Sequence, residues 1–401
     1  MRFKRVLFIA PHYREDFYQA AAIPVGLGYL ASALKASGIE YAVMDMGIDL
    51  GRKYGLADLQ NKIKSFTQDL IAISQMSYRY KDHYRLAEQI KQPGAQFKIV
   101  VGGPHVSSLG GKVLEDCPAI DYGIVLEGEE TLVELCQGKP EKDILGLFYR
   151  DNGQVMFAGQ RQLIADLDKI PFPRYESFEL GAYSKDIMPI FSSRGCPFSC
   201  VYCAAGKVIG KNIRTRSIPL LIEEVEYWQK NNYREIGIGD DNFTFYKERA
   251  VLFCEEVLKR GLNKKGRFSV GNGIRADKAD RKLLELMKRA NFYCVALGVE
   301  AGNNRILENI KKGERIEVIE EALKNCAELG FEIKLYFLVG SPGEGARDIE
   351  DSIKLALKYP VMTARFYNLI PYPGTELFEW VEKNKYFVHQ PEKYLNDFSI
   401  F

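Results

Sequence analysis

Long apolar runs and an excess of either charge are absent from this sequence of 401 residues. No apolar stretch approaches the roughly 18 residues that a membrane-spanning helix requires, so we expect a soluble protein without a membrane span. The 55 basic and 53 acidic residues leave a net charge of +2, which gives no support to nucleic acid or an anionic membrane surface as a partner. The short apolar run at residues 6–10 is followed at once by Pro11 and charged residues, which indicates a first strand and not a signal peptide.

Cysteine is also scarce, with eight in the whole chain, which is too few for a disulfide scaffold. Three of them, Cys196, Cys200 and Cys203, nevertheless fall within eight consecutive positions. Such clustering indicates metal binding in a reducing compartment, so we expect a cytoplasmic protein. The others stand singly in apolar or helical stretches and are expected to be ordinary buried thiols: Cys117, Cys136, Cys254, Cys294 and Cys326.

Residues 1–136 alternate short apolar runs with helical periods. The runs fall at residues 6–10, 41–44, 70–74, 97–101 and 122–126. Short apolar strands separated by helices favour a parallel sheet covered on both faces, and five of them predict a flavodoxin-like doubly wound α/β domain. Residues 137–185 lose this rhythm, so we interpret them as a linker segment with a hairpin turn at Asp151-Asn152-Gly153.

A second series of strands and helices occupies residues 186–371. The strands are expected near residues 188–192, 235–239, 267–270, 293–299, 333–339 and 363–369. Six such units fall short of the eight of a closed barrel, so we predict a partial (β/α)6 TIM-like barrel with its sites at the strand C-termini. Residues 372–401 are too few for another domain, and we expect a short tail that leaves an open cleft.

The three clustered cysteines form a C-x3-C-x2-C loop after the first strand of the predicted barrel. Thiolates are the usual ligands of iron-sulfur centres, and three of them can hold three corners of a cubane cluster. Because no fourth cysteine is nearby, one iron stays open to a small molecule. The alternative is a structural zinc site, which normally needs a fourth Cys or His that this neighbourhood lacks.

This motif on a six-unit domain resembles the radical S-adenosylmethionine (SAM) superfamily over about residues 187–375. The resemblance implies that SAM chelates the open iron, and that one electron from the 4Fe-4S cluster splits SAM into methionine and a deoxyadenosyl radical. An external electron donor such as a flavodoxin or ferredoxin is implied as a partner. The residues that the resemblance assigns to SAM binding are Tyr202, Asp240, Asp241, Arg275, Glu300, Gly340, Ser341 and Asn368.

Four of these assignments have a plainer alternative. Asp240 and Asp241 offer carboxylates to an ammonium group, but they are also suited to capping the next helix. Glu300 resembles the ribose contact of the family and Arg275 a contact to the SAM carboxylate, while both residues also suit surface ion pairs. A glycine at position 340 would let the backbone approach adenine closely.

The first domain resembles the cobalamin-binding domain at the N-terminus of many radical SAM enzymes. Ser74-Gln75-Met76, followed one strand later by Gly102-Gly103, is close to the S-x-L and G-G pair that holds the nucleotide tail in that family. An empty, purely structural domain is the alternative. The residues that the resemblance assigns to cobalamin are Pro24, Gly26, Ser74, Gln75, Met76, Tyr78, Gly102, Gly103, His105, Glu127 and Gly128.

Histidine ligation of cobalt is not expected, because none of His12, His83, His105 and His389 lies in the D-x-H-x-x-G motif of cobalamin mutases. His105 is interpreted either as a loop contact to the cofactor or as a polar turn residue. By resemblance, the loop that begins at Ser74 approaches the lower face of the corrin. Its Gln75, Met76 or Tyr78 either blocks water there or packs against the sheet.

The two resemblances together imply a C-methyltransferase that methylates an unactivated carbon through a deoxyadenosyl radical and methylcobalamin. The open cleft favours a peptide or protein substrate, although a small molecule such as a lipid or tetrapyrrole is also compatible with it. The alternative function is a non-methylating radical SAM cyclase or oxidative rearrangement enzyme that uses cobalamin for electron transfer.

Overall fold

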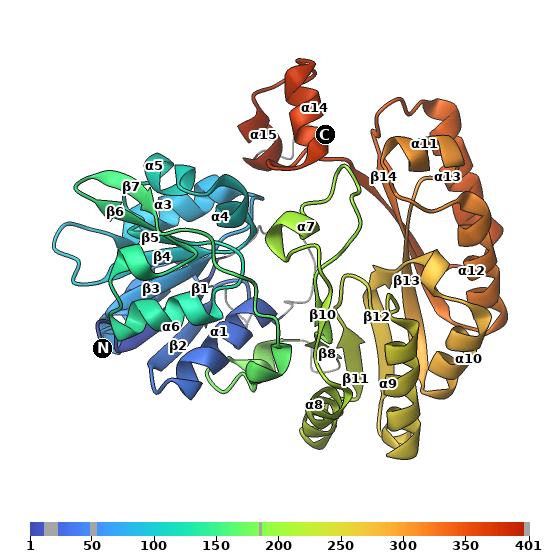
Figure 1. Cartoon of the computed structure of the whole chain (residues 1–401), viewed down its shortest axis with the longest axis horizontal. Helices are drawn as coiled ribbons and strands as arrows, with labels where there is room; N and C mark the ends of the chain where they lie inside the picture. The colour runs from blue at the N-terminus through green and yellow to red at the C-terminus, as the bar shows by residue number, and fades with distance from the viewer. Residues whose placement is uncertain (12–22, 49–53, 184–186, 397–401) are drawn as a thin grey trace.

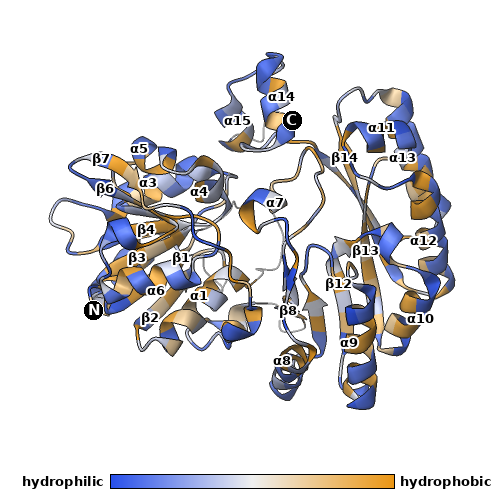
Figure 2. Ribbon diagram, viewed as in Figure 1, coloured by the Kyte–Doolittle hydropathy of each residue, from blue (hydrophilic) through white to orange (hydrophobic). Residues whose placement is uncertain are grey.

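The computed structural model describes residues 1–11, 23–48, 54–183 and 187–396. It contains two large sheets side by side, one mostly and one wholly parallel, with the short helix α7 (Ala205–Val208) between them (Figure 1). Apolar residues concentrate on the strands of both sheets and polar residues on the outer sides of the helices (Figure 2). Within these ranges, no helix combines the length and apolar character needed to cross a membrane.

The N-terminal sheet has the strand order β2-β1-β3-β4-β5-β6-β7. Its first five strands are parallel and confirm the predicted flavodoxin-like order. These strands are β1 (Arg5–Ala10), β2 (Glu40–Asp45), β3 (Leu70–Ser74), β4 (Lys98–Gly102) and β5 (Tyr122–Ile124). The helices between them are α1 (Val25–Ala36), α2 (Leu56–Phe66), α3 (Tyr80–Ile90), α4 (Pro104–Leu109), α5 (Lys112–Asp116) and α6 (Glu129–Gln137).

Strand β1 shows why both faces of this sheet are covered. Successive side chains of a strand point to opposite faces, and here Phe8 joins one apolar core while Leu7 and Ile9 join another. The first core includes residues of α1 and α6, and the second includes residues of α2, α3 and α5. A strand buried on both sides has no polar alternation, which is why it appears as a continuous apolar run in the sequence.

A hairpin extends this sheet beyond the five predicted strands. Strands β6 (Leu147–Asp151) and β7 (Gln154–Phe157) are antiparallel, and they flank the predicted turn at Asn152 and Gly153. Phe148 and Phe157 stack at 4.3 Å between ring centroids. We had interpreted the whole of residues 137–185 as a linker, and the structure adds its first part to the sheet.

The rest of this segment packs between the two domains. Tyr175 lies 5.7 Å from Trp228 of the second domain between ring centroids, and a Cβ at Gly28 in α1 would fall 2.4 Å from the Tyr175 ring. The Tyr183 hydroxyl donates to Asp45 at 2.7 Å. These contacts join the cores of the two domains through the connecting chain.

Short 3₁₀ helices occur in both halves of the chain and lie at Glu141–Asp143, Leu167–Lys169, Leu180–Ala182, Leu262–Lys264 and Ala276–Lys278.

The second sheet has the order β15-β14-β13-β12-β11-β8 with every neighbouring pair parallel, which confirms the partial barrel. Its strands are β8 (Ile187–Ile190), β11 (Glu235–Ile238), β12 (Arg267–Ile274), β13 (Phe292–Glu300), β14 (Glu332–Val339) and β15 (Thr363–Asn368). The helices are α8 (Ile218–Lys230), α9 (Lys247–Lys259), α10 (Arg281–Arg289), α11 (Asn304–Asn309), α12 (Ile316–Glu328) and α13 (Ala346–Lys358). Helices α9 to α13 lie on the side of the sheet away from the N-terminal domain (Figure 1).

The chain after β15 bridges the two domains and does not leave the cleft simply open as we had expected. Helices α14 (Glu376–Lys383) and α15 (Pro391–Asn396) lie above the space between the sheets (Figure 1). The Leu377 amide donates to the Val201 carbonyl at 2.9 Å, and the Arg79 amide donates to the Leu395 carbonyl at 2.7 Å. The tail therefore joins the cysteine loop to the start of α3.

Candidate functional site

The cysteine loop lies between two short antiparallel strands, β9 (Ser193–Arg194) and β10 (Arg214–Thr215). Its backbone is fixed on both sides, since the Cys196 amide donates to the Gly210 carbonyl at 3.0 Å and the Val201 amide donates to the Ile310 carbonyl at 3.1 Å. Gly195 has a φ of +110°, and a Cβ there would lie 2.2 Å from the Asn212 carbonyl oxygen. Only glycine fits this position.

The three cysteines of this loop form no disulfide and are at least partly accessible. Cys196 and Cys200 are half-buried and Cys203 is exposed, whereas the other five cysteines are buried, as predicted. Desolvation by the surrounding protein, together with the nearby Cys200 and Cys196, raises the pKa of Cys203 to about 11. Within the described ranges, no three His, Cys, Asp or Glu side chains are grouped to hold one metal ion.

Asp240 and Asp241 lie at the end of β11 but in different surroundings. The carboxylate of the fully buried Asp240 accepts hydrogen bonds from the Ser192 amide at 2.6 Å and from the Ser193 hydroxyl at 2.6 Å. Both of its oxygens are thus engaged in holding the start of the cysteine loop, and neither faces an open site. Asp241 is exposed, yet enough protein surrounds it to raise its pKa to about 6, and Asp240 adds repulsion.

Arg275 braces the cysteine loop from the barrel. Its guanidinium stacks over the ring of Phe198, which lies in the loop, at 3.7 Å. The same group donates to the carbonyls of Lys312 at 2.8 Å and Gly313 at 2.9 Å. Arg275 is buried, so its ion pairs are not the surface pairs that we had considered as the alternative.

Glu300 ends β13 in the left-handed region, with a φ of 67°. Its carboxylate accepts a hydrogen bond from the buried Lys312 ammonium at 3.1 Å. Burial raises the pKa of Tyr202 well above its ordinary value, and the neighbouring Glu300 raises it further. The structure therefore brings Tyr202, Glu300 and Arg275 together around the cysteine loop.

The remaining predicted SAM residues lie at the ends of β14 and β15. Gly340 has a φ of +94°, and a Cβ there would have no protein atom within 4 Å. Ser341 is buried, and its hydroxyl has no hydrogen-bond partner among the described residues. Asn368 ends β15 opposite Val339 and is exposed. These residues share the strand-end edge of the sheet with the cysteine loop.

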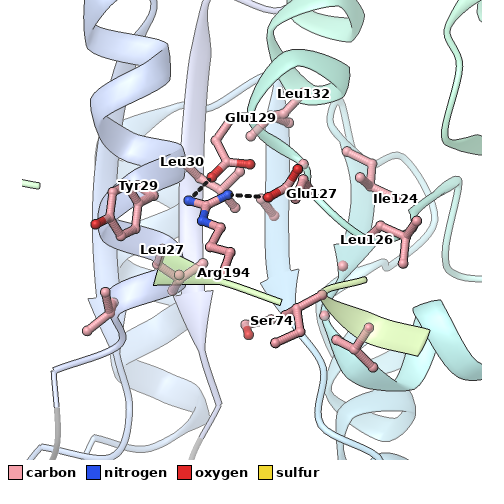
Figure 3. A pocket seen from close by; sticks show the side chains of 18 of the residues that line it. Leu27, Tyr29, Leu30, Ser74, Ile124, Leu126, Glu127, Glu129, Leu132 and Arg194 are labelled. Carbon is pink, nitrogen blue, oxygen red and sulfur yellow. Dashed lines mark hydrogen bonds and ion pairs between the residues drawn. The ribbon is translucent and has the colours of Figure 1, made fainter. Parts of the chain in front are cut away.

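A cavity of about 310 Å³ lies between the N-terminal domain and the barrel (Figure 3). Six of the residues predicted to bind cobalamin line it: Gly26, Ser74, Gly102, Gly103, Glu127 and Gly128. The barrel contributes further wall residues that sequence reasoning missed, among them Arg194, Val208 and Ile209. Leu27, Leu30, Ile124, Leu126 and Leu132 make much of the wall apolar.

Charged residues from both domains close one side of this cavity. The Glu127 carboxylate accepts hydrogen bonds from Arg194 at 2.8 Å and from Arg214 at 2.8 Å. Arg194 also donates to Glu129 at 2.7 Å, and the two contacts that Arg194 makes, with Glu127 and with Glu129, are drawn in Figure 3. Burial lowers the pKa of Arg194, but Glu129 and Glu127 outweigh that effect and raise it overall. Glu127 thus bridges the domains.

The other predicted cobalamin residues, which are Pro24, Gln75, Met76, Tyr78 and His105, are not part of the cavity wall. His105 is fully buried, stacks on Tyr80 at 4.4 Å between ring centroids and lies 3.2 Å from the Tyr84 hydroxyl. This position inside the core fits neither interpretation of His105, since a loop contact to the cofactor would line the cavity and a polar turn residue would be exposed. Burial lowers its pKa to about 3, so the imidazole is neutral.

The loop after β3 combines a buried and an exposed side chain. Gln75 is fully buried, and neither of its side-chain amide atoms has a hydrogen-bond partner among the described residues. Met76 is 43% exposed, and Tyr78 lies near Tyr372 of the chain that follows the barrel. A Cβ at Gly103 would fall 2.6 Å from the Gln75 carbonyl oxygen, so glycine there permits the close packing of the two loops.

The cavity fits an extended group with apolar and polar parts. A Cβ at Gly26 would meet no protein atom within 4 Å, so this wall offers bare backbone to a ligand. The cysteine loop, in turn, offers three thiols and no other metal-ligating side chain within the loop, which suits an iron-sulfur cluster. The residues present therefore fit both groups that the sequence led us to expect.

Comparison with known proteins gives two family matches. The model described as "Radical SAM superfamily" matches residues 190–356, and the model described as "B12 binding domain" matches residues 18–136. A relative named "Uncharacterized methyltransferase PH0819" from Pyrococcus horikoshii is 31% identical over 395 residues, which cover 96% of this chain and 84% of the relative.

Two further proteins are similar over nearly the whole chain. The anaerobic magnesium-protoporphyrin IX monomethyl ester cyclase of Cereibacter sphaeroides is 25% identical, with coverage of 94% of this chain and 63% of the relative. The solved structure of the radical S-adenosylmethionine methyltransferase TsrM from Kitasatospora setae, with cobalamin and a [4Fe-4S] cluster bound, has a TM-score of 0.83 at 18% identity. It covers 96% of this chain and 79% of that one, and at this identity it shows the shared fold.

Proposed function

Because the chain belongs to the radical SAM superfamily and carries a B12-binding domain at its N-terminal end, we propose that it is a cobalamin-dependent C-methyltransferase. It acts on an unactivated carbon of its substrate, which we propose to be a peptide or protein. Its cofactors are a [4Fe-4S] cluster, SAM and cobalamin. An external flavodoxin or ferredoxin supplies the electrons. When bound, the cofactors supply one-electron chemistry and a transferable methyl group.

The residues divide this work between the two domains. Cys196, Cys200 and Cys203 hold the cluster, and Arg275 and Phe198 keep their loop in place. Glu300 and Tyr202 lie beside that loop as contacts for SAM. In the N-terminal domain, the cavity between α1 and the ends of β3 and β4 takes the nucleotide tail of cobalamin against the bare backbone of residues 26, 102 and 103.

One observation supports this proposal: residues next to the cysteine loop form part of the cavity wall. Val208 and Ile209 line the cavity and follow Cys203 by only a few residues, at the end of α7. Arg194, two residues before Cys196, is bound to Glu127 on the opposite wall. A transfer that involves both cofactors requires them to be adjacent, and the cysteine loop and part of the cavity wall belong to the same short stretch of chain here.

The decisive experiment is anaerobic turnover with SAM that carries an isotopically labelled methyl group, followed by mass spectrometry of candidate peptides and small molecules. We expect a product that gains the labelled methyl group, together with S-adenosylhomocysteine and deoxyadenosine. Deoxyadenosine and a changed substrate without any methyl gain would contradict methylation. That result would favour a cyclase or oxidative rearrangement, the alternative supported by the similarity to a protein named as a cyclase.

A further inference from the structure

The last two strands of the barrel turn different kinds of side chain to their two faces. On the outer face, Phe337 is fully buried in the apolar core that includes residues of α12, and it stacks on Phe366 of β15 at 4.7 Å between ring centroids. Side chains alternate between the faces of a strand. The neighbouring Tyr336 and its partner in register, Arg365, therefore face the inside of the barrel.

Hydrogen bonds and ring contacts confirm which residues lie inside. The Tyr336 hydroxyl donates to the Gly271 carbonyl at 2.9 Å. The Tyr336 side chain therefore extends from β14 across the inner face of β13 to β12. Tyr336 and Tyr367 lie 6.1 Å apart between ring centroids, and Arg365 donates to the Tyr367 hydroxyl at 3.4 Å. Tyr367 is one residue before the end of β15, on the same edge of the sheet as Glu300 and the cysteine loop. This cluster therefore lies inside the barrel next to the proposed SAM site.

Two positive charges in this region are not neutralised by protein. Arg365 is exposed and forms no ion pair with any residue that the structure describes. Lys334, on the same face of β14, is half-buried and likewise makes no ion pair within the described part of the chain. Lys334 instead lies beside the Cys294 thiol. The strand register makes Lys334 and Arg365 diagonal neighbours, since Lys334 pairs with Thr363.

The acidic group deeper in the barrel does not balance these charges. Glu235 is 2% exposed and is already bound by Arg267 at 3.0 Å and by the Tyr293 hydroxyl at 2.8 Å. The inner face of β14 and β15 thus presents a guanidinium and an ammonium without ion pairs among the described residues, together with two tyrosine rings. Glu332, at the start of β14, adds a carboxylate to the same face near Cys294. A guanidinium binds carboxylate and phosphate groups with paired hydrogen bonds.

We propose that Arg365, Lys334, Tyr336 and Tyr367 bind an oxyanion group of the substrate, either a carboxylate or a phosphate. This inference rests on the proposed function, because it takes the barrel interior as the place where the substrate lies. Arg365 and Lys334 bind the charge, while the rings of Tyr336 and Tyr367 flank the part of the substrate next to it. The substrate is therefore an anion.

The test uses small aromatic anions as probes of this site in the anaerobic protein with its cofactors bound. Benzoate and phenyl phosphate are titrated, and benzamide serves as the uncharged probe of similar shape. Binding is followed by saturation-transfer NMR in wild-type protein, Arg365→Gln, Arg365→Lys and Lys334→Gln. The matched control is Arg289→Gln, which removes an exposed arginine at the end of α10 on the outside of the barrel.

We expect the apparent Kd of one or both anions to rise at least tenfold in Arg365→Gln and several-fold in Lys334→Gln. Arg365→Lys should recover part of the loss, Arg289→Gln should equal wild type, and benzamide should not distinguish the proteins. The anion that loses more affinity identifies a carboxylate or a phosphate as the natural group. Equal anion binding in wild type and both neutral variants, or no binding in wild type, overturns the inference.

The proposed function is judged by a separate measurement, which is labelled methyl transfer by the wild-type protein. Methyl transfer without an Arg365-dependent anion site overturns this inference alone. An Arg365-dependent anion site in a protein that cleaves SAM but never transfers methyl to any anionic candidate overturns the proposed methylation alone. Equal thermal unfolding of Arg365→Gln and Arg289→Gln shows that lost binding does not reflect lost folding.

Discussion

The barrel and the N-terminal domain build their parts of the candidate site in different ways. The barrel presents three cysteines on one short loop, and backbone hydrogen bonds hold that loop to residues 210, 310 and 377. The N-terminal domain presents a cavity whose wall is completed by barrel residues and fixed by ion pairs across the domain boundary. The first site is local and the second exists only while the domains stay together, so the two should fail in different ways.

The largest effect should follow from removing the three thiols of the cysteine loop. Replacing Cys196, Cys200 and Cys203 with alanine should abolish cluster reconstitution and deoxyadenosine formation, because no other ligands within the loop replace them. Cobalamin binding should remain, since none of these residues lines the cavity. Iron analysis and the absorbance of bound cobalamin measure the two outcomes.

A suitable control for this variant is Cys326→Ala, which removes a buried core thiol of α12. It should keep its iron. Unchanged iron content in the triple variant would show that the cluster lies elsewhere, and loss of cobalamin together with iron would show that the two sites are not independent.

The ion pairs across the domain boundary should give the next largest effect. Glu127→Gln keeps the shape of the side chain but leaves Arg214 and part of Arg194 without a counter-ion. Breaking a buried pair in this way costs about 3 kcal/mol, and we expect the free energy of unfolding to fall by that order. Chemical denaturation measures it. Glu130→Gln, which removes a mostly exposed partner of Arg161, should change stability by less than about 1 kcal/mol.

The same Glu127→Gln variant sharpens the comparison between the domains. Cobalamin affinity should fall because the cavity wall loosens, whereas iron content should be kept because the cysteine loop is fixed by its backbone. If Glu127→Gln loses iron before it loses cobalamin, the assignment of the two sites to separate supports is wrong.

A larger side chain at Gly26 should occupy part of the cavity. Gly26→Leu places a side chain where no protein atom lies within 4 Å, so the fold should tolerate it while the ligand loses space. We expect cobalamin affinity to fall about tenfold, or about 1.4 kcal/mol, at unchanged iron content. Gly181→Leu, another position with open space around its Cβ but away from the cavity, is the control. Equal cobalamin affinity in both variants would contradict the placement of the ligand.

The difference between the sites also explains how much of the molecule could be predicted. The cysteine loop was predictable because its three cysteines fall within eight positions of the sequence. The residues Ser74, Gly102 and Gly103 were predictable because their strands end at one edge of a parallel sheet. The role of Arg194 could not be predicted, since its partners Glu127 and Glu129 are more than 60 residues away in the sequence. The local sequence does not indicate which charged residues form ion pairs across a domain boundary.

The same physical reason accounts for the other differences. The β6–β7 hairpin was recognised by its turn, but its place in the sheet depends on contacts of Phe148 with Gly110 and Gly111. The C-terminal tail bridges the domains through Leu377 and Leu395, whose apolar character alone did not indicate a partner. Asp240 is polar at a strand end, as a ligand would be, yet its hydrogen bonds to Ser192 and Ser193 make it part of the support of the loop.

The smallest effect that we predict distinguishes the interiors of the two domains. His83 and His105 are buried in the N-terminal domain, and burial lowers their pKa values to about 4 and about 3. The unfolded chain takes up protons on these groups as the pH falls through their ordinary pKa of about 6.5, while the folded domain does not. The contribution of these neutral histidines to the free energy of unfolding is therefore fully present above about pH 6.5, and it is lost as the pH falls toward the pKa values of the folded state. For a single histidine, the loss from pH 6.5 to pH 5.5 is about 1 kcal/mol.

The barrel should not show this pH dependence from histidine, because among the described residues its core contains no histidine. Amide hydrogen exchange read by mass spectrometry should therefore show protection falling more in β1 to β4 than in β11 to β14 over this pH step. His105→Phe keeps a ring to stack on Tyr80 and removes one titrating group, so it should reduce the pH dependence of the N-terminal strands. The exposed His389→Phe should not. An equal pH response of both domains, unaffected by His105→Phe, would show that carboxylates and not these histidines control acid stability.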